Sequence, residues 1–233
     1  MLAAQKRSRA EAPGLRSPPV LQNGDRLKSG EFLRRYEAMP ELKKAELIEG
    51  KVFMGSPVSA SEHGKQDGII QTWLGTYAAH TPGVDLYTNT TLILDSDNTF
   101  QPDGILCFTK GRQGQSRLDP MGYVLGSVEL VVEVAASSES IDLGEKFDVY
   151  ARNGIGEYLV WRTRDKAFDW FVLENQVYQS QLPDARGILR SRCFIGLELD
   201  VAALLRLNAT QVIAKLQRAL RTSAHAAFAR RHR

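Results

Sequence analysis

Cysteine is scarce, because the 233 residues contain only Cys107 and Cys193. Two cysteines cannot build a disulfide framework, and they cannot form a zinc site alone. Each lies in an apolar stretch with the pattern of a strand. We therefore predict that both are small buried side chains in a reducing compartment, which favours a cytoplasmic location.

Long apolar runs are also missing. A membrane-spanning helix needs about 18 or more consecutive apolar residues. The longest apolar run, near Val128–Ala136, is interrupted by Glu129 and Glu133. The basic N-terminal segment has no apolar core of the kind found in secretory signals. We therefore expect neither a membrane span nor a secretory signal.

Acidic residues are absent from one end of the chain. Residues 206–233 contain seven Lys/Arg and no Asp or Glu, and residues 1–35 contain eight Lys/Arg and three acids. Residues 36–205 then hold 15 basic and 24 acidic side chains, a balance of −9. An acidic body does not suit a protein that simply coats DNA. It suits carboxylates gathered around a divalent cation, or an ordinary solubilising surface with loose basic ends.

The composition favours one folded domain with extensions. A hydrophobic fraction of 43% and a charged fraction of 24% are ordinary for a globular protein. Residues 1–24 have no periodicity and predict a disordered basic lead-in. We assign residues 25–205 to the folded domain and residues 206–233 to a basic amphipathic C-terminal helix. Its apolar stripe contains Val212, Ile213, Leu216 and Leu220.

The order of helical and strand patterns predicts an α/β domain with a mixed central sheet flanked by helices. Ser29 can cap a short helix over Glu31–Glu37, and a hairpin AELIE–G–KVFM follows. Ser59 or Ser61 can cap a long helix that ends near Ala79. The run SVELVVEVA is nearly continuous in β-branched residues, as expected of a central strand buried on both faces. A helix over Ser140–Asn153 and several further strands complete the pattern.

Two carboxylates occupy positions where charge is costly. Glu133 lies inside the central strand, and Asp103 follows a proline at the start of another strand, QPDGILCF. If these strands pair, the two acids converge at one edge of the sheet. Carboxylates ~4 Å apart repel by roughly 4 kcal/mol at an effective dielectric of 20, so they need a proton or a cation. Oxygen-only ligands favour Mg²⁺ or Mn²⁺. Alternatively, Asp103 is a turn residue and Glu133 a charge on an edge strand.

Lys146 lies in the helix that follows the Glu133 strand. Asp142 and Tyr150 stand four residues before and after it. In a metal-dependent hydrolytic site, such a lysine would orient the attacking water and offset the charge that builds on the phosphate. Without that context, the pattern equally describes a lysine that faces solvent in a ladder of helical salt bridges.

Five strings in order, AELIEG, SEHGKQ, QPDGILCF, LVVEVAASS and GEKFDVYARNGIGEYLVW, resemble the Uma-two family of restriction endonucleases. That family belongs to the PD-(D/E)XK nuclease superfamily, and the resemblance spans roughly residues 29–200. It implies that Asp103 is the metal-binding acid of the PD motif and Glu133 the second acid. It also implies that the backbone carbonyl of Val134 is a further ligand and that Glu46 completes the metal shell.

The resemblance includes one departure from the superfamily pattern. The usual lysine stands two residues after the second acid, where this chain has Ala135. Lys146 must therefore reach back from the helix. Glu46 and Glu49 would face opposite sides of a strand, and we favour Glu46. His63 matches a histidine of the family. Its role stays open between helix capping, substrate contact and catalysis.

These features favour a Mg²⁺- or Mn²⁺-dependent endonuclease that cuts nucleic acid, with DNA as the expected substrate. Asp103 and Glu133 would bind the metal, while Glu46 and Lys146 would assist, with His63 as an accessory residue. The basic ends would supply phosphate contacts, and a homodimer would suit the cutting of both strands. The alternatives are an inactive nuclease fold that binds nucleic acid or a protein partner, and a structural protein with scattered acids.

Overall fold

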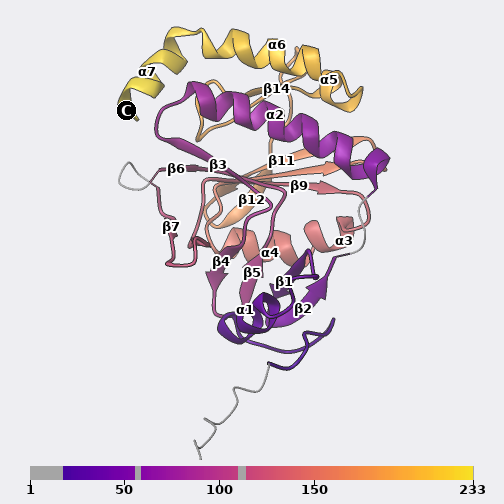
Figure 1. Ribbon diagram of the computed structural model, residues 1–233. Coiled ribbons are helices and arrows are strands. Elements are labelled where there is room, and N and C mark those ends of the chain that lie inside the picture. The colour runs from indigo at the N-terminus through magenta and orange to yellow at the C-terminus, as the bar shows by residue number, and fades with distance from the viewer. Residues whose placement is uncertain (1–17, 56–58, 110–113, 233) are drawn as a thin grey trace, which may run out of the picture.

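The computed structural model describes residues 18–55, 59–109 and 114–232 (Figure 1). Most of the predicted lead-in, residues 1–24, lies outside the described residues. Its last part is packed against the fold, because Leu21 is 2% exposed and joins an apolar cluster with Phe32 and Val52. Packing therefore begins before residue 25, where the sequence suggested that the domain starts.

The first of two six-stranded sheets has the strand order β2-β1-β5-β4-β8-β7. Its strands are β1 Ala45–Ile48, β2 Lys51–Met54, β4 Leu92–Asp95, β5 Asn98–Phe100, β7 Arg117–Leu118 and β8 Val124–Leu125. The predicted hairpin is β1–β2, and its turn residues Glu49 and Gly50 have φ values of 51° and 71°. Two successive positive φ values are typical of the tight turn that matches the twist of a hairpin.

The second sheet is mixed and has the order β12-β11-β10-β9-β6-β3. Its strands are β3 Val84–Thr88, β6 Gly104–Phe108, β9 Leu130–Ala135, β10 Glu157–Arg162, β11 Ala167–Glu174 and β12 Val177–Ser180. The inner strand β9 is antiparallel to β6 and parallel to β10. A short pair, β13 Ile188–Arg190 and β14 Glu198–Asp200, stands apart. The predicted α/β class with a mixed sheet is confirmed.

Helices cover both faces of the second sheet. Figure 1 shows α2 above it and α4 below it, with α6 and α7 lying over α2. The helical segments are α1 Ser29–Glu37, the π-helix η1 Ala60–Gly64, α2 Lys65–His80, α3 Glu139–Asp142, α4 Glu145–Arg152, α5 Val201–Leu205, α6 Ala209–Leu220 and α7 Ser223–Arg231. Within the three described stretches, none of these helices has the length and hydropathy needed to cross a bilayer.

The strand β9 is buried on both faces, which explains its nearly continuous apolar sequence. Leu130, Val132 and Val134 belong to the cluster that packs against α2. Val131 and Ala135 belong to the cluster on the α4 side. Because successive side chains point to opposite faces, Glu133 shares the α4 side with Val131 and Ala135.

Three helix predictions need correction. Ser29 does not cap α1; Lys28 is the N-cap, and the Ser29 hydroxyl donates to the carbonyl of Asp95 at 2.8 Å. The helix predicted over Ser140–Asn153 is split into α3 and α4 at Gly144, where a Cβ atom would lie 2.5 Å from the carbonyl oxygen of Ser140. The single C-terminal helix is split into α6 and α7, because Thr222 caps a new helix.

The segment FQPDGILCF, which reads as one strand, changes sheets in the middle. Phe100 ends β5 in the first sheet, and Gly104 begins β6 in the second. Asp103 therefore lies where the chain crosses between the sheets. A Cβ atom at Gly104 would lie 2.8 Å from Cγ1 of Val132 on β9. Glycine at this position thus lets β6 approach β9 closely beside Asp103.

Candidate active site

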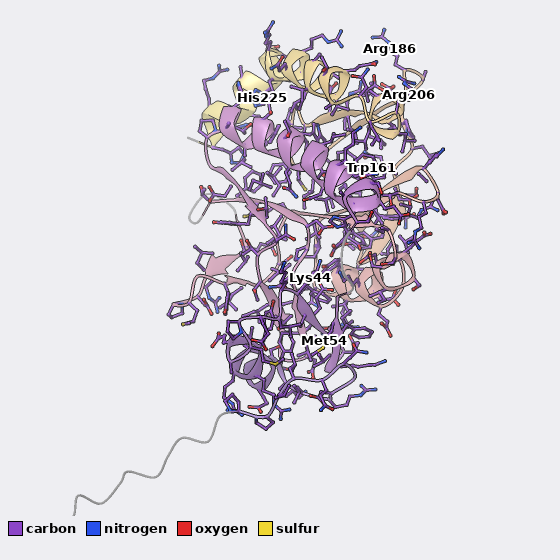
Figure 2. All side chains as sticks on the ribbon, turned by 45° about the vertical axis from the view of Figure 1, so that its right-hand side comes forward. Lys44, Met54, Trp161, Arg186, Arg206 and His225 are labelled. Atoms are coloured by element: carbon purple, nitrogen blue, oxygen red, sulfur yellow. The ribbon has the colours of Figure 1, made fainter. Side chains whose placement is uncertain are left out.

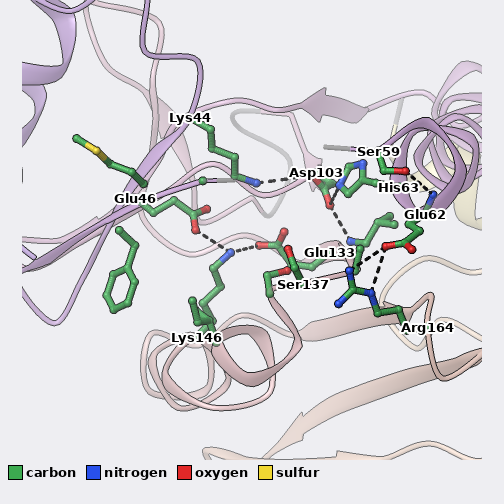
Figure 3. Close-up of a pocket in the computed structure, with 17 residues that line it drawn as sticks. Lys44, Glu46, Ser59, Glu62, His63, Asp103, Glu133, Ser137, Lys146 and Arg164 are labelled. Atoms are coloured by element: carbon green, nitrogen blue, oxygen red, sulfur yellow. Dashed lines mark hydrogen bonds and ion pairs between the residues drawn. The ribbon is translucent and has the colours of Figure 1, made fainter. Parts of the chain in front are cut away.

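A pocket of about 270 Å³ opens between the two sheets, η1 and the α3–α4 segment (Figure 3). Its charged lining comes from segments that are far apart in the sequence. The ionisable side chains that line it are Lys44, Glu46, Glu62, His63, Asp103, Glu133, Lys146 and Arg164. The five candidate site residues of the sequence analysis are therefore all in one place.

Glu46 enters the pocket from β1. Its Oε1 accepts a hydrogen bond from the backbone N–H of Gln101 at 2.9 Å, and Oε2 lies 2.9 Å from Nζ of Lys146. Burial acts to raise the pKa of Glu46, but the positive charges of Lys146 and Lys44 hold it below its usual value. Glu49, the competing acid, lies in the hairpin turn and pairs with Arg152 at the surface.

Asp103 links β6 to β9 and η1. Its Oδ2 accepts a hydrogen bond from the backbone N–H of Val134 at 2.7 Å and lies 3.3 Å from Nε2 of His63. Its Oδ1 is 3.7 Å from Nζ of Lys44. Burial acts to raise the pKa of Asp103, yet the His63 hydrogen bond and the Lys44 charge lower it overall. Asp103 is therefore held as a carboxylate.

Glu133 lies on β9 with its side chain 3% exposed. Its Oε1 accepts hydrogen bonds from Nζ of Lys146 at 2.8 Å and from the hydroxyl of Tyr150 at 3.3 Å. Burial raises the pKa of Glu133 to about 8; Lys146 opposes this rise, and the charge of Asp142 adds to it. Near neutral pH this side chain therefore takes up or gives up a proton readily.

Lys146 is the centre of the charge arrangement. Its Nζ lies 2.8 Å from Glu133, 2.9 Å from Glu46 and 3.1 Å from Asp142, and its side chain is 3% exposed. Burial acts to lower the pKa of Lys146, but these carboxylates raise it well above its usual value. The lysine does reach back from α4 into the pocket, and it carries a proton there.

His63 lies in η1, just before α2, and its side chain is 18% exposed. Helix capping is performed by Ser59, whose hydroxyl oxygen accepts from the N–H groups of Ser61 and Glu62. The imidazole instead faces Asp103, and that hydrogen bond raises the pKa of His63. Its position fixes the orientation of the Asp103 carboxylate.

Lys44 is a pocket residue that the sequence analysis missed. It stands two residues before Glu46, so both side chains lie on the same side of the extended chain. The charge of Lys44 acts on Glu46, Asp103 and Glu133 alike. A search for charged residues two positions from a candidate acid in a predicted strand could have identified Lys44. Asp142, which the sequence analysis placed four residues before Lys146, does contact the lysine, at 3.1 Å.

The carboxylates of the pocket are ligands of the kind that a hard divalent cation binds. Glu46, Asp103 and Glu133 offer only oxygen ligands, which Mg²⁺ prefers. Among the described residues, Oε2 of Glu133 accepts no hydrogen bond, and Oδ1 of Asp103 has Lys44 at 3.7 Å. In the same part of the chain, no group of three or more His, Cys, Asp or Glu is already gathered as a metal site. Ammonium and imidazole groups balance the carboxylates in this arrangement.

Comparison with known proteins places the fold and the family. Residues 30–202 match the Uma2 family, which is described as "Putative restriction endonuclease". A putative nuclease of the DUF820 group from Anabaena variabilis ATCC 29413 has a similar crystal structure, with a TM-score of 0.59 and 12% sequence identity. The alignment covers 76% of this chain and 98% of that one, and at this identity it shows the fold alone. Among proteins with curated descriptions, none matches this chain.

The family match includes every carboxylate that faces Lys146 and leaves out α6 and α7. It also covers the strings on which the motif resemblance depends, so that resemblance is confirmed. The chain belongs to the Uma2 family, whose description is "Putative restriction endonuclease".

Proposed function

We propose that this protein is a divalent-metal-dependent endonuclease that hydrolyses phosphodiester bonds of DNA. One observation carries the proposal: Asp103, Glu133 and Lys146 line a single pocket together with Glu46. A protein that used this fold only for support would gain nothing from burying four charged side chains beside an open pocket.

The metal would be held by Asp103 and Glu133, with the carbonyl of Val134 and the carboxylate of Glu46 completing its surroundings. Mg²⁺ or Mn²⁺ bound there would supply Lewis-acid chemistry and lower the pKa of a bound water. His63 would keep Asp103 in place through its 3.3 Å contact. The raised pKa of Glu133 makes metal binding compete with a proton at this side chain.

Lys146 would orient the attacking water and stabilise the negative charge that develops on the phosphate. Its ammonium group is protonated and is held from three sides by Glu46, Glu133 and Asp142. A donor fixed before the reaction needs no reorganisation when charge develops, which is the main source of such stabilisation. Water adds to phosphorus and loses one proton, one P–O bond breaks, and the leaving oxygen gains one proton, so no net proton is needed.

Nicking of supercoiled plasmid tests the proposal. We expect the wild type to nick the plasmid with Mg²⁺ or Mn²⁺ and not with EDTA. Asp103→Asn should lower the rate by at least about a hundredfold, as expected when a metal ligand or a key electrostatic group is lost. Asp97→Asn removes a surface acid that pairs with Lys28 and serves as the control. Equal nicking by wild type and Asp103→Asn would refute the proposal.

Two further outcomes define the alternatives. A protein that binds Mn²⁺ and DNA without cutting either strand would be a binding protein with a nuclease fold. Light scattering of the protein with and without DNA would show whether a homodimer forms, which cutting of both strands would suit. Plasmid, single-stranded DNA and RNA compared side by side would give the substrate preference.

A further inference from the structure

The C-terminal helices carry a surface of arginines without acids. We use the name C-terminal basic face for the exposed arginines at the ends of α5, α6 and α7, namely Arg206, Arg218, Arg221, Arg230 and Arg231. The sequence from residue 206 to its end contains no Asp or Glu. The α6–α7 segment lies outside residues 30–202, which the family model matches.

Many arginines on the rest of the described surface have acidic partners, while Arg26, Arg117 and Arg186 are exposed without an ion pair but are scattered along the chain. Arg34 pairs with Glu31, and Arg164 pairs with Glu62, in both cases with exposed guanidinium groups. Among the described residues, none of the five arginines of the C-terminal basic face has an ion pair with a carboxylate. Arg218 only donates from Nε to the carbonyl of Ala214 in its own helix. The positive charge of this face is therefore not neutralised within the protein.

The face is fixed to the fold. The apolar side of α6 and α7 is buried, with Val212, Leu216 and Phe228 in the same core cluster as α2. His225 also joins α7 to the segment after α2, since its Nε2 lies 3.0 Å from the hydroxyl oxygen of Thr81. The arginines are therefore presented on packed helices, so a partner need not order the backbone when it binds.

The partner that fits this face is a nucleic acid. Arginine side chains are the common contacts to backbone phosphates, and unpaired positive charge drives such binding through the release of counterions. A membrane surface fits less well, because amphipathic membrane helices insert large apolar side chains. The exposed large apolar residues of the described chain, namely Val20, Leu118, Met121, Val177 and Leu182, are all outside α6 and α7.

We propose that the C-terminal basic face binds the sugar–phosphate backbone of nucleic acid without regard to base sequence. It is a second contact surface, separate from the pocket, and it does not depend on the proposed cleavage. Figure 2 shows Arg206 and His225 at one end of the molecule and Met54 towards the other, with Lys44 of the pocket between them. Contacts at this face would thus anchor a strand away from the reacting bond.

Salt-dependent binding of a fluorescent DNA duplex to the full chain tests the proposal. The measurement is made in EDTA, so no cleavage takes place. The test variant is Arg218→Gln/Arg221→Gln, and the matched control is Arg34→Gln/Arg192→Gln, which loses the same net charge from arginines that pair with Glu31 and Glu174. We expect the test variant to bind about tenfold or more weakly, and its slope of log K against log salt to fall by about two. The control should change little.

The results separate this proposal from its rivals. Equal slopes for the test and control variants, with both proteins folded by circular dichroism, would overturn it. Arginine-dependent binding to phosphatidylserine vesicles in place of the duplex would assign the face to membranes and would also overturn it. Absence of plasmid nicking together with the expected change in slope would refute the proposed nuclease function and leave this proposal standing.

Discussion

Nζ of Lys146 lies 2.8 Å from Oε1 of Glu133, and each of the two side chains is only 3% exposed. The pair joins α4 to β9, and Glu46 on β1 contacts the same ammonium group at 2.9 Å. A helix and strands from both sheets therefore meet at one buried positive charge. The predictions below follow from this arrangement and from the other buried polar groups of the fold.

Replacing Lys146 should destabilise the protein strongly. In Lys146→Met, the carboxylates of Glu46 and Asp142 and the carboxyl group of Glu133 lose the cation that they share in a buried site. Removing one partner of a buried ion pair costs about 3–5 kcal/mol. Urea denaturation at neutral pH measures this loss in the free energy of unfolding. Lys28→Met, which removes an exposed pair with Asp97, should cost less than about 1 kcal/mol. Equal losses in both variants would contradict the prediction.

The stability of the metal-free protein should fall as the pH rises through the Glu133 range. Burial raises the pKa of Glu133 from 4.5 in the unfolded chain to about 8 in the fold. Between these values the folded state binds a proton that the unfolded state has lost, so the free energy of unfolding decreases with pH. Denaturation of wild type and Glu133→Gln from pH 5 to pH 9 would test this. The Gln variant should have the shallower slope; parallel slopes would show that Glu133 is not responsible.

The buried carboxylate of Glu157 should stabilise the loop between β13 and β14. Its Oε1 accepts hydrogen bonds from the Ser191 hydroxyl at 2.8 Å and from the backbone N–H groups of Arg192 and Cys193 at 2.7 Å each. Its Oε2 accepts a hydrogen bond from Nε1 of Trp170 at 2.8 Å. Glu157→Gln places an amide among these donors, so we expect a loss of about 1–3 kcal/mol in the free energy of unfolding.

Thermal and urea unfolding measure this loss, with tryptophan fluorescence as a local probe of Trp170. Ser191→Ala, which deletes one donor and leaves the carboxylate, should cost about 1 kcal/mol. A Glu157→Gln variant as stable as the wild type would show that these hydrogen bonds do not stabilise the fold.

Glu62 and Arg164 should affect substrate binding in opposite directions. Nη2 of Arg164 lies 2.9 Å from Oε2 of Glu62, and both residues line the pocket. If DNA is the substrate, Arg164→Gln removes a positive charge that a phosphate would meet, and KM should rise about three- to tenfold. Glu62→Gln frees the arginine, so KM should fall. Steady-state cleavage assays measure both effects. A shift of the same sign in the two variants would mean that the pair only supports the structure.

Much of the fold could be predicted from local patterns, because those patterns follow from burial. The run around Glu133 predicted a strand buried on both faces, and β9 confirms it. Cys107 is buried as predicted, whereas Cys193 is only half-buried. The helix break at Gly144 was missed, because a glycine within an amphipathic pattern looks tolerable until the backbone contact with Ser140 is known.

The site could be predicted only in part. Asp103 and Glu133 stood out because carboxylates in strands are costly, and the structure brings them to one pocket. Their catalytic and metal-binding roles stay a prediction. Lys44 did not stand out, since a lysine just before a strand is ordinary at a surface. Its importance depends on long-range packing that places β1 beside β5 and thereby beside Asp103.

The order of these groups along the chain has a consequence for biosynthesis. Glu46, Asp103 and Glu133 are translated before Lys146, so a growing chain holds these three acids before it holds the ammonium group that contacts Glu46 and Glu133. Until α4 has left the ribosome, Lys44 and His63 can offset the charge of Asp103, but Glu46 and Glu133 lack the contact with Lys146. The pocket can therefore close only after α4 has been made, well past the middle of the 233-residue chain.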